Sequence, residues 1–303
     1  MSLKMDMSDS VGRDGRLQPD LPIGILDSGV GGLSVLRHIH QQLPHENLIY
    51  VADQAHVPYG HRPAAEVRAF TGEITRFLLT IGVKLVVVAC NTASAAALTW
   101  LRETFPQVPF VGMEPAVKPA AHQTRSGKVG VLATAGTFVS QRYATLMERY
   151  ARDVVLFENP CVGLVEQIEA GAIDTPETEA LLRSFLMPML TAGVDTIVLG
   201  CTHYPFALPV IERIVGTAVA IIDPAPAVAR QTGRVLQQHQ ALTSRQEQGQ
   251  IHLLTSGNEH KFHKLARQLL NIPIKTGTIH WKNGRLHPDQ KTRLQYNLPR
   301  ETT

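Results

Sequence analysis

Short apolar runs alternate with helix-like stretches along most of the chain, from Pro22 to Leu270. The runs are rich in Val, Ile and Leu without regular polar alternation, which is typical of parallel strands covered on both faces. Between them lie stretches such as residues 63–81, which begins with a proline suited to a first helical turn. This alternation predicts an α/β fold with mostly parallel sheets. The expected strands are residues 22–26, 48–52, 84–89, 108–112, 128–133, 153–157, 195–199, 219–222 and 250–254.

The ends of these expected strands follow a pattern that occurs twice. Residues 24–28 (GILDS) and 130–134 (GVLAT), which lie 106 positions apart, each end on a hydroxyl residue. Residues 86–92 (VVVACNT) and 197–203 (IVLGCTH) each contain a cysteine followed by polar residues, with the two cysteines 111 positions apart. Because both features recur in the same order, the sequence predicts two pseudo-symmetric α/β domains.

The length of 303 residues also favours two domains over one. We expect residues 21–115 and 222–272 to form the first domain and residues 116–221 to form the second. The active site is expected in the cleft between them. Residues 1–20 are predicted to be a disordered N-terminal tail, and residues 273–303 a basic C-terminal tail.

Composition excludes several classes of protein. The net charge is only +3, which gives no strong signal for a polyanionic partner. The segment from Ile251 onward contains nine Lys and Arg residues but only three acidic residues. We interpret this end as a solvated tail that binds no nucleic acid. No run of about 18 apolar residues and no apolar signal segment occurs, so we expect a cytoplasmic protein without a membrane partner.

The cysteines are three in number and widely spaced, at Cys90, Cys161 and Cys201. An odd number without a CxxC pair predicts neither a disulfide framework nor a zinc site, so no metal is expected. In a reducing compartment such thiols remain free for chemistry. For Cys161, which has no polar neighbours in sequence, a buried apolar role is the simpler interpretation.

Cys90 and Cys201 each lie between an expected strand and an expected helix, where the helix N-terminus favours a thiolate. Asp27 stands at the end of another expected strand, and His203 lies two residues after Cys201. Both could move protons to and from the thiols. In parallel sheets such positions line a ligand site. Neutral hydrogen-bonding residues that could hold a carboxylate there without arginine are Ser28, Asn91, Thr92, Thr134, Thr137 and Thr202.

Two opposed acid/base groups suit the removal of a proton from one face of a carbon and its return on the other face. This predicts an amino-acid racemase or epimerase. A single-thiol hydrolase or decarboxylase, and a non-catalytic amino-acid-binding module, stay open as alternatives. The glycine-rich residues 27–32 do not form a dinucleotide-binding loop, because Ser34 stands where the third glycine should be.

A set of motifs resembles glutamate racemase, a member of the aspartate/glutamate racemase superfamily, over residues 22–271. The cysteine motifs CNTAS and GCTHYP are the most specific of them. The motifs are residues 24–37 (GILDSGVGGLSVLR), 57–60 (VPYG), 87–98 (VVACNTASAAAL), 111–120 (VGMEPAVKPA), 131–137 (VLATAGT), 198–205 (VLGCTHYP) and 255–270 (TSGNEHKFHKLARQLL).

The resemblance implies racemisation of L-glutamate to D-glutamate for peptidoglycan synthesis, without pyridoxal phosphate or any other cofactor. It implies that Cys90, assisted by Asp27, serves D-glutamate and that Cys201, assisted by His203, serves L-glutamate. Aspartate or another amino acid is the alternative substrate. Besides glutamate, the resemblance suggests a homodimer and a peptidoglycan-precursor activator as partners.

The resemblance also implies roles for residues around the thiols. Pro58, Tyr59 and Gly60 would cover the cleft. Glu166, which follows a Leu-Val pair, would be the supporting carboxylate, although Glu169 lies one helical turn further on and stays an alternative. The residues that would hold the substrate are Ser28, Asn91, Thr92, Thr134, Thr137 and Thr202.

Overall fold

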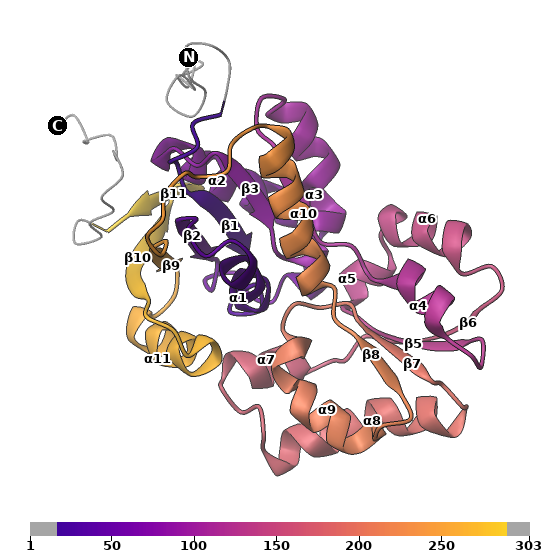
Figure 1. Ribbon diagram of the computed structural model, residues 1–303. Coiled ribbons are helices and arrows are strands. Elements are labelled where there is room, and N and C mark those ends of the chain that lie inside the picture. Colours follow the sequence, from indigo (N-terminus) through magenta and orange to yellow (C-terminus); the bar gives the residue numbers. More distant parts are fainter. Residues whose placement is uncertain (1–16, 290–303) are drawn as a thin grey trace.

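The computed structural model describes residues 17–289 and arranges their strands in two separate sheets (Figure 1). Every strand pairing in this part of the chain is parallel except that of β10 with β11. The predicted α/β class with mostly parallel sheets is therefore confirmed. The larger sheet, in the order β11-β10-β9-β2-β1-β3-β4, contains β1 (Ile23–Asp27), β2 (Leu48–Ala52), β3 (Leu85–Val88), β4 (Phe110–Gly112), β9 (Ile251–Thr255), β10 (Lys275–Lys282) and β11 (Arg285–Pro288).

The smaller sheet repeats part of the larger one. Its order, β6-β5-β7-β8, is the order β2-β1-β3-β4 with each strand replaced by its counterpart. Cys90 follows β3 and Cys201 follows β7, so the two cysteines occupy corresponding places in the two sheets. The strands of the smaller sheet are β5 (Lys128–Leu132), β6 (Val155–Asn159), β7 (Thr196–Leu199) and β8 (Ala220–Ile222).

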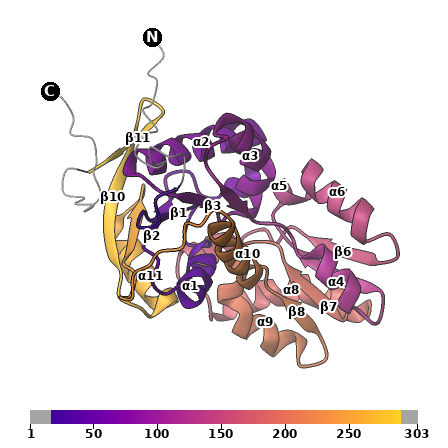
Figure 2. The ribbon, with the colours of Figure 1, turned by 45° about the horizontal axis from the view of Figure 1, so that its top comes forward.

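Helices cover both faces of the larger sheet, as Figure 2 shows. The apolar side chains of α1, α10 and α11 pack on one face, and those of α2 and α3 pack on the other. Among the described residues, no helix is both long and apolar enough to cross a lipid bilayer. These helices are α1 (Leu33–Gln42), α2 (Ala64–Ile81), α3 (Asn91–Thr104), α10 (Ala225–Gln238) and α11 (Glu259–Leu270).

The smaller sheet has α4 and α6 on one face and α7, α8 and α9 on the other. The apolar residues of α7 to α9 continue into the cluster beneath α1, α10 and α11, so one core joins the two sheets. The remaining elements are α4 (Val117–Gln123), α5 (Ala135–Phe138), α6 (Gln141–Tyr150), α7 (Leu164–Glu169), α8 (Pro176–Thr191), α9 (Leu208–Val215) and the 3₁₀ turns η2 (Tyr59–His61) and η3 (Tyr204–Ala207).

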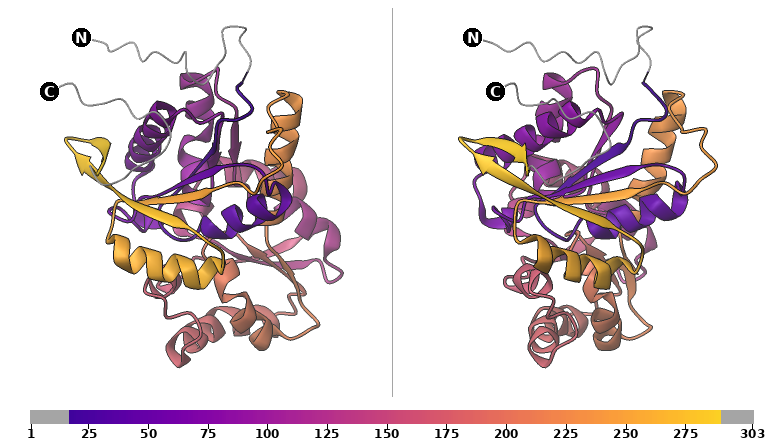
Figure 3. Two further views of the ribbon diagram at one scale, coloured as in Figure 1. Left: turned by 60° about the vertical axis from the view of Figure 1, so that its left-hand side comes forward. Right: turned by 90° about the vertical axis from the view of Figure 1, so that its left-hand side faces the viewer.

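The basic tail predicted for residues 273–303 is wrong for its first part. β10 pairs with β9 in parallel and then turns back as β11, so this segment extends the larger sheet (Figure 3). Asn283 and Gly284, with φ angles of 52° and 71°, form the connecting turn. Two residues with positive φ are what a tight hairpin turn requires, and an Asn-Gly pair supplies them readily. The rest of that predicted tail, residues 290–303, lies outside the described residues.

The predicted N-terminal tail, residues 1–20, extends too far, because residues 17–20 are part of the fold. Leu17 is buried in the core, and the carbonyl of Pro19 accepts a hydrogen bond from the ammonium of Lys84. Lys84 is itself buried, where it forms an ion pair with Glu46 and binds the carbonyl of Ala241. Because a buried ammonium needs a partner for each proton, Lys84 holds residues 17–20 against the sheet. Residues 1–16 of the predicted tail lie outside the described part of the chain.

Candidate active site

A pocket lies at the carboxyl ends of β1, β3, β5 and β7, where both sheets contribute side chains. The two cysteines predicted to act together, Cys90 and Cys201, both line it. Of the predicted site residues, Asp27, Thr137 and Glu166 are not in its wall. The lining residues are Ser28, Pro58, Tyr59, Gly60, Cys90, Asn91, Thr92, Thr134, Val165, Cys201, Thr202 and His203.

Cys90 is the N-cap of α3, and its sulfur accepts a hydrogen bond from the amide of Ala93 at 3.4 Å. Asp27, the last residue of β1, is fully buried, and its Oδ2 accepts the amides of Gly29 and Gly32 at 3.1 and 3.0 Å. These amides belong to the turn that opens α1, so the turn holds the Asp27 carboxylate in one orientation.

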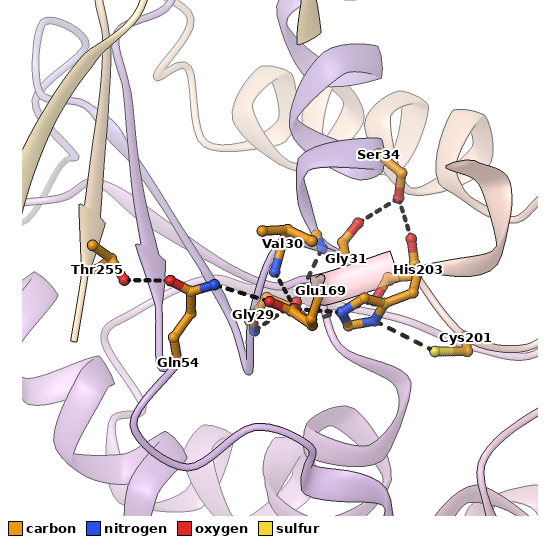
Figure 4. Close-up of polar contacts among 12 residues, drawn as sticks. Gly29, Val30, Gly31, Ser34, Gln54, Glu169, Cys201, His203 and Thr255 are labelled. Atoms are coloured by element: carbon orange, nitrogen blue, oxygen red, sulfur yellow. Dashed lines mark hydrogen bonds and ion pairs between the residues drawn. The ribbon is translucent and has the colours of Figure 1, made fainter. Parts of the chain in front are cut away.

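Cys201 has a histidine and a carboxylate in line behind it, as Figure 4 shows. The sulfur lies 3.7 Å from Nδ1 of His203, and Nε2 of the same ring lies 2.7 Å from Oε1 of Glu169. The backbone amide of Val30, from the other sheet's first loop, donates to the same Glu169 oxygen at 2.7 Å. Glu169 therefore orients His203 against Cys201 and joins the two halves of the site.

The electrostatics of the two thiols differ. Burial, reinforced by the charge of Asp27, raises the pKa of the Cys90 thiol well above its ordinary value. Burial also raises the pKa of Asp27, against the opposing effects of His203 and the two amides. On the other side, burial opposes a charged His203, but hydrogen bonds with Cys201 and Glu169 outweigh it and raise the pKa of the imidazole well above its usual range. Cys90 is thus held as a thiol, and Cys201 has a proton-carrying partner.

The carboxylate beside His203 is Glu169, not the predicted Glu166. Glu166 is half-exposed, and its Oε1 lies 3.9 Å from Nε2 of His61. Glu169 is largely buried. Burial alone would raise the pKa of Glu169, but hydrogen bonds from His203, the Val30 amide and Gln54 lower it below the ordinary value. The prediction of Glu166 as the supporting carboxylate is therefore corrected, because Glu166 does not reach the histidine.

Hydroxyl groups connect the two walls of the pocket. The Thr92 hydroxyl, on α3, lies 2.9 Å from that of Thr134, which lies 3.2 Å from that of Thr137. On the opposite side, the hydroxyl of Ser34 donates to the carbonyl of Thr202 at 2.9 Å. Ser34 was not predicted as a site residue. The predicted Thr137 does not line the pocket, but its hydroxyl contacts that of Thr134, which does.

Asn91 has an unusual environment. Both polar atoms of its side chain are buried, and neither has a hydrogen-bond partner among the described residues. A buried amide without partners is costly, so such a group in a pocket wall indicates a ligand that supplies them. One donor and one acceptor at this position suit a ligand with both an acidic and an amino group.

The pocket is small in this structure, with a volume of about 20 Å³. That is room for about one water molecule. An amino acid is several times larger, so its entry requires the two walls to separate. Between residues 17 and 289 no cluster of three His, Cys, Asp or Glu side chains is placed to bind a metal ion.

A methyl group at Gly29 is expected to break the Glu169–His203 contact. A Cβ added there would lie 1.8 Å from Oε1 of Glu169, so the carboxylate must move. Since that contact helps to raise the pKa of His203, Gly29→Ala should lower the pKa of the imidazole toward its ordinary value. Titration of the His203 ring by NMR measures this change.

The matched control for this substitution is Gly233→Ala, inside α10, where an added Cβ meets only Leu43 at 3.5 Å or more. It should leave the His203 titration unchanged and stabilise the protein by about 0.5–1 kcal/mol. An unchanged His203 pKa in Gly29→Ala would show that Glu169 does not support the histidine.

The known proteins that this chain resembles in sequence and in fold are racemases. The chain matches the family model described as Asp/Glu/Hydantoin racemase over residues 23–232. It is 56% identical over 224 residues to the glutamate racemase of Pseudomonas aeruginosa. The aligned region covers 74% of this chain and 84% of that protein.

Two solved structures have a similar fold. The crystal structure of a glutamate racemase isoform from Bacillus anthracis has a TM-score of 0.79 and 33% sequence identity, covering 88% of this chain and all of that one. The glutamate racemase of Escherichia coli, solved with L-glutamate and the activator UDP-MurNAc-Ala, has a TM-score of 0.75 and 31% identity. That match covers 85% of this chain and 97% of the other.

Proposed function

Because this chain belongs to the Asp/Glu/hydantoin racemase family and, within it, to the glutamate racemases, we propose that it interconverts L- and D-glutamate by proton transfer between Cys90 and Cys201. The observation that carries the proposal is that one pocket contains both thiols, at corresponding places in two repeated sheets. Each thiol has a different acid/base partner, which is what opposite faces of one carbon require.

In the proposed reaction from L-glutamate, the Cys201 thiolate removes the α-proton and the Cys90 thiol delivers a proton to the opposite face. His203 exchanges protons with Cys201, and Asp27 does so for Cys90. In the reverse direction the two cysteines exchange roles. The scheme includes no cofactor, and each proton that leaves the substrate is replaced by one from the protein.

The charge that develops on the α-carbon and its carboxylate needs donors already in place. Asn91, whose amide is unpaired, is the best placed of them. We propose that it holds the substrate together with neighbouring groups, and that residues 58–60 cover it. The other substrate-binding residues of the proposal are Ser28, Thr92, Thr134, Thr137 and Thr202.

A single-thiol hydrolase would use only Cys201, His203 and Glu169, which lie in the order that such enzymes need. That alternative leaves Cys90, its N-cap position and Asp27 without a role. The racemase proposal accounts for both sides of the pocket, so we favour it.

We further propose that the product D-glutamate supplies peptidoglycan synthesis in the cytoplasm. A homodimer and a peptidoglycan-precursor activator stay predictions from the resemblance.

Substrate choice is tested by a panel of single enantiomers followed by circular dichroism. We expect both glutamate enantiomers to lose their signal, ending at an equimolar mixture, because mirror-image molecules have equal free energy. Aspartate should react at least about 100-fold more slowly, since a site with buried polar groups rejects a ligand that leaves them unpaired. Faster turnover of aspartate would overturn the substrate assignment.

A further inference from the structure

A chain of hydrogen bonds extends from Cys201 beyond Glu169 into the larger sheet (Figure 4). The second oxygen of Glu169, Oε2, accepts the side-chain amide of Gln54 at 2.9 Å. Oε1 of Gln54 in turn accepts the hydroxyl of Thr255 at 2.9 Å. Neither Gln54 nor Thr255 lines the pocket. The chain therefore connects a thiol to two residues that the reaction itself does not use.

The hydrogen bonds along this chain can point in only one direction. The Thr255 hydroxyl oxygen already accepts the backbone amide of Gly257 at 3.0 Å, so its own proton is free to go to Gln54. A glutamine side chain that accepts at its oxygen must present its NH₂ group on the other side. That group meets the Glu169 carboxylate, an acceptor. The carboxylate, which can only accept, therefore fixes the Gln54 amide with its NH₂ group toward Glu169, and the Thr255 hydroxyl donates to the oxygen on the other side.

The sheet itself sets the distance between these residues. Thr255 is the last residue of β9 and pairs in register with Ala52, the last residue of the neighbouring strand β2. Gln54 follows β2 by two residues. Backbone pairing of the two strands thereby holds Gln54 beside Thr255. This gives Gln54 a rigid support, as a group that orients a catalytic side chain needs.

Gln54 binds Oε2 of Glu169, the carboxylate oxygen that Val30 and His203 do not contact. The Val30 amide and the His203 ring both bind Oε1, so without Gln54 the carboxylate could rotate and pull that oxygen off line. A bond at Oε2 stops the rotation. Oε1 then stays aligned with Nε2 of His203, and Nδ1 stays aligned with the Cys201 sulfur.

We propose that Gln54, supported by Thr255, is a positioning residue that acts through Glu169 and His203 on proton transfer at Cys201 and not at Cys90. The inference rests on the proposed racemisation. Cys90 has its own direct partners, the Ala93 amide and the Asp27 carboxylate, and the printed hydrogen bonds of Gln54 go to neither of them. Loss of Gln54 should therefore slow one of the two proton transfers and leave the other unchanged.

Rates alone cannot show which transfer has slowed. The two enantiomers have equal free energy, so kcat/KM must be the same in both directions for any variant. Primary isotope effects do distinguish the transfers. When the step at one thiol slows, the effect grows for the α-deuterated enantiomer that this thiol deprotonates and shrinks for the other. A partly misfolded sample lowers the rate but leaves both isotope effects unchanged.

The experiment measures kcat/KM and the isotope effects with α-deuterated L- and D-glutamate for Gln54→Leu, Thr255→Val and Thr255→Ser. His203→Asn is the reference, because it weakens the Cys201 side directly. The matched control is Gln42→Leu, which removes a glutamine donor from the end of α1, where it binds the carbonyl of Pro226.

Gln54→Leu should lower kcat/KM roughly 10-fold, as expected for one hydrogen bond to a charged group. Its two isotope effects should change in opposite directions, with the same signs as in His203→Asn. Thr255→Val should do the same more weakly, Thr255→Ser should restore wild-type values because it keeps the hydroxyl, and Gln42→Leu should match the wild type.

The proposal is overturned if Gln54→Leu keeps its full rate. For Gln54→Leu protein whose circular dichroism and melting temperature match the wild type, it is equally overturned if the rate falls while the two isotope effects stay unchanged, change together, or change with signs opposite to those of His203→Asn. These results leave the proposed function intact, since that function fails only if the wild-type protein does not racemise glutamate.

Discussion

Replacement of either Cys90 or Cys201 by alanine is expected to lower the rate of glutamate racemisation by at least about 10³-fold, because each thiol is the group proposed to exchange a proton directly with the substrate on its face. The sulfur of each lies in the pocket wall, next to a separate proton source. The other acid/base group beside a thiol, the His203 imidazole, lies behind the Cys201 sulfur and is bound to Glu169 through its second nitrogen, so it is not placed to take over from the thiol. Chiral chromatography of the products measures the loss.

Each single variant should also keep a partial activity that identifies its remaining base. In heavy water, Cys201→Ala retains Cys90 and should exchange the α-proton of D-glutamate without inverting it. Cys90→Ala should do the same with L-glutamate. The result would reveal which enantiomer each thiol serves.

Cys161→Ala is the matched control. Cys161 is also buried, but it lies outside the pocket wall, before α7. Its variant should racemise at close to the wild-type rate. Substantial racemisation by either pocket variant, or a loss in Cys161→Ala as large as in the other two, would contradict the assignment.

Glu169→Gln is expected to lower kcat about 100-fold, whereas Glu166→Gln should change it less than about twofold. Glutamine keeps the size of the side chain but removes the charge that helps to hold His203 protonated. The two glutamates lie on the same short helix, α7, so each variant controls for disturbance of that helix. Steady-state kinetics in both directions measures the difference.

The pH profile gives a second test of Glu169. In the wild type the pKa of His203 is raised, so the imidazole stays charged until the pH exceeds that raised value. Without the carboxylate the pKa falls. The imidazole then loses its proton at lower pH, and the alkaline limb of kcat/KM moves in that direction. An equal effect of both substitutions, or an unmoved limb in Glu169→Gln, would contradict the role of Glu169.

The order of elements could be predicted because buried parallel strands have a distinct composition. All nine expected strands exist, with boundaries that differ by at most two residues. The strand β10 was not expected, because it alternates buried and exposed positions and contains charged residues at both ends. Its clearest signal was the Asn283–Gly284 pair, which is typical of a two-residue hairpin.

The pattern of buried positions along α7 also indicates which glutamate lies beside His203. Glu169 lies four positions after the buried Val165 and so faces the same side of the helix. Glu166 lies two positions from both Leu164 and Ile168, which are buried, and so faces the opposite side. Sequence similarity around a Leu-Val pair pointed to the wrong residue, whereas burial periodicity favours the right one.

The role of Gln54 could not be predicted from the sequence. Its two partners, Glu169 and Thr255, are 115 and 201 positions away. The pairing of β2 with β9 brings Thr255 to Gln54, and Glu169 reaches it from α7, on the other side of the site. A polar residue after a strand has no periodic pattern that distinguishes it from an ordinary loop residue. The same holds for Ser34, which meets Thr202 across 168 positions.

The central claim is that two thiols act on opposite faces of one carbon. The most direct test is to incubate wild-type protein with L-glutamate in heavy water and to stop the reaction at a few per cent conversion. We predict that the D-glutamate formed carries deuterium at the α-carbon while the recovered L-glutamate still carries protium, because the proton that is added comes from a different thiol than the one that removed it. Equal early deuteration of both enantiomers would mean that a single base serves both faces, and it would contradict the account.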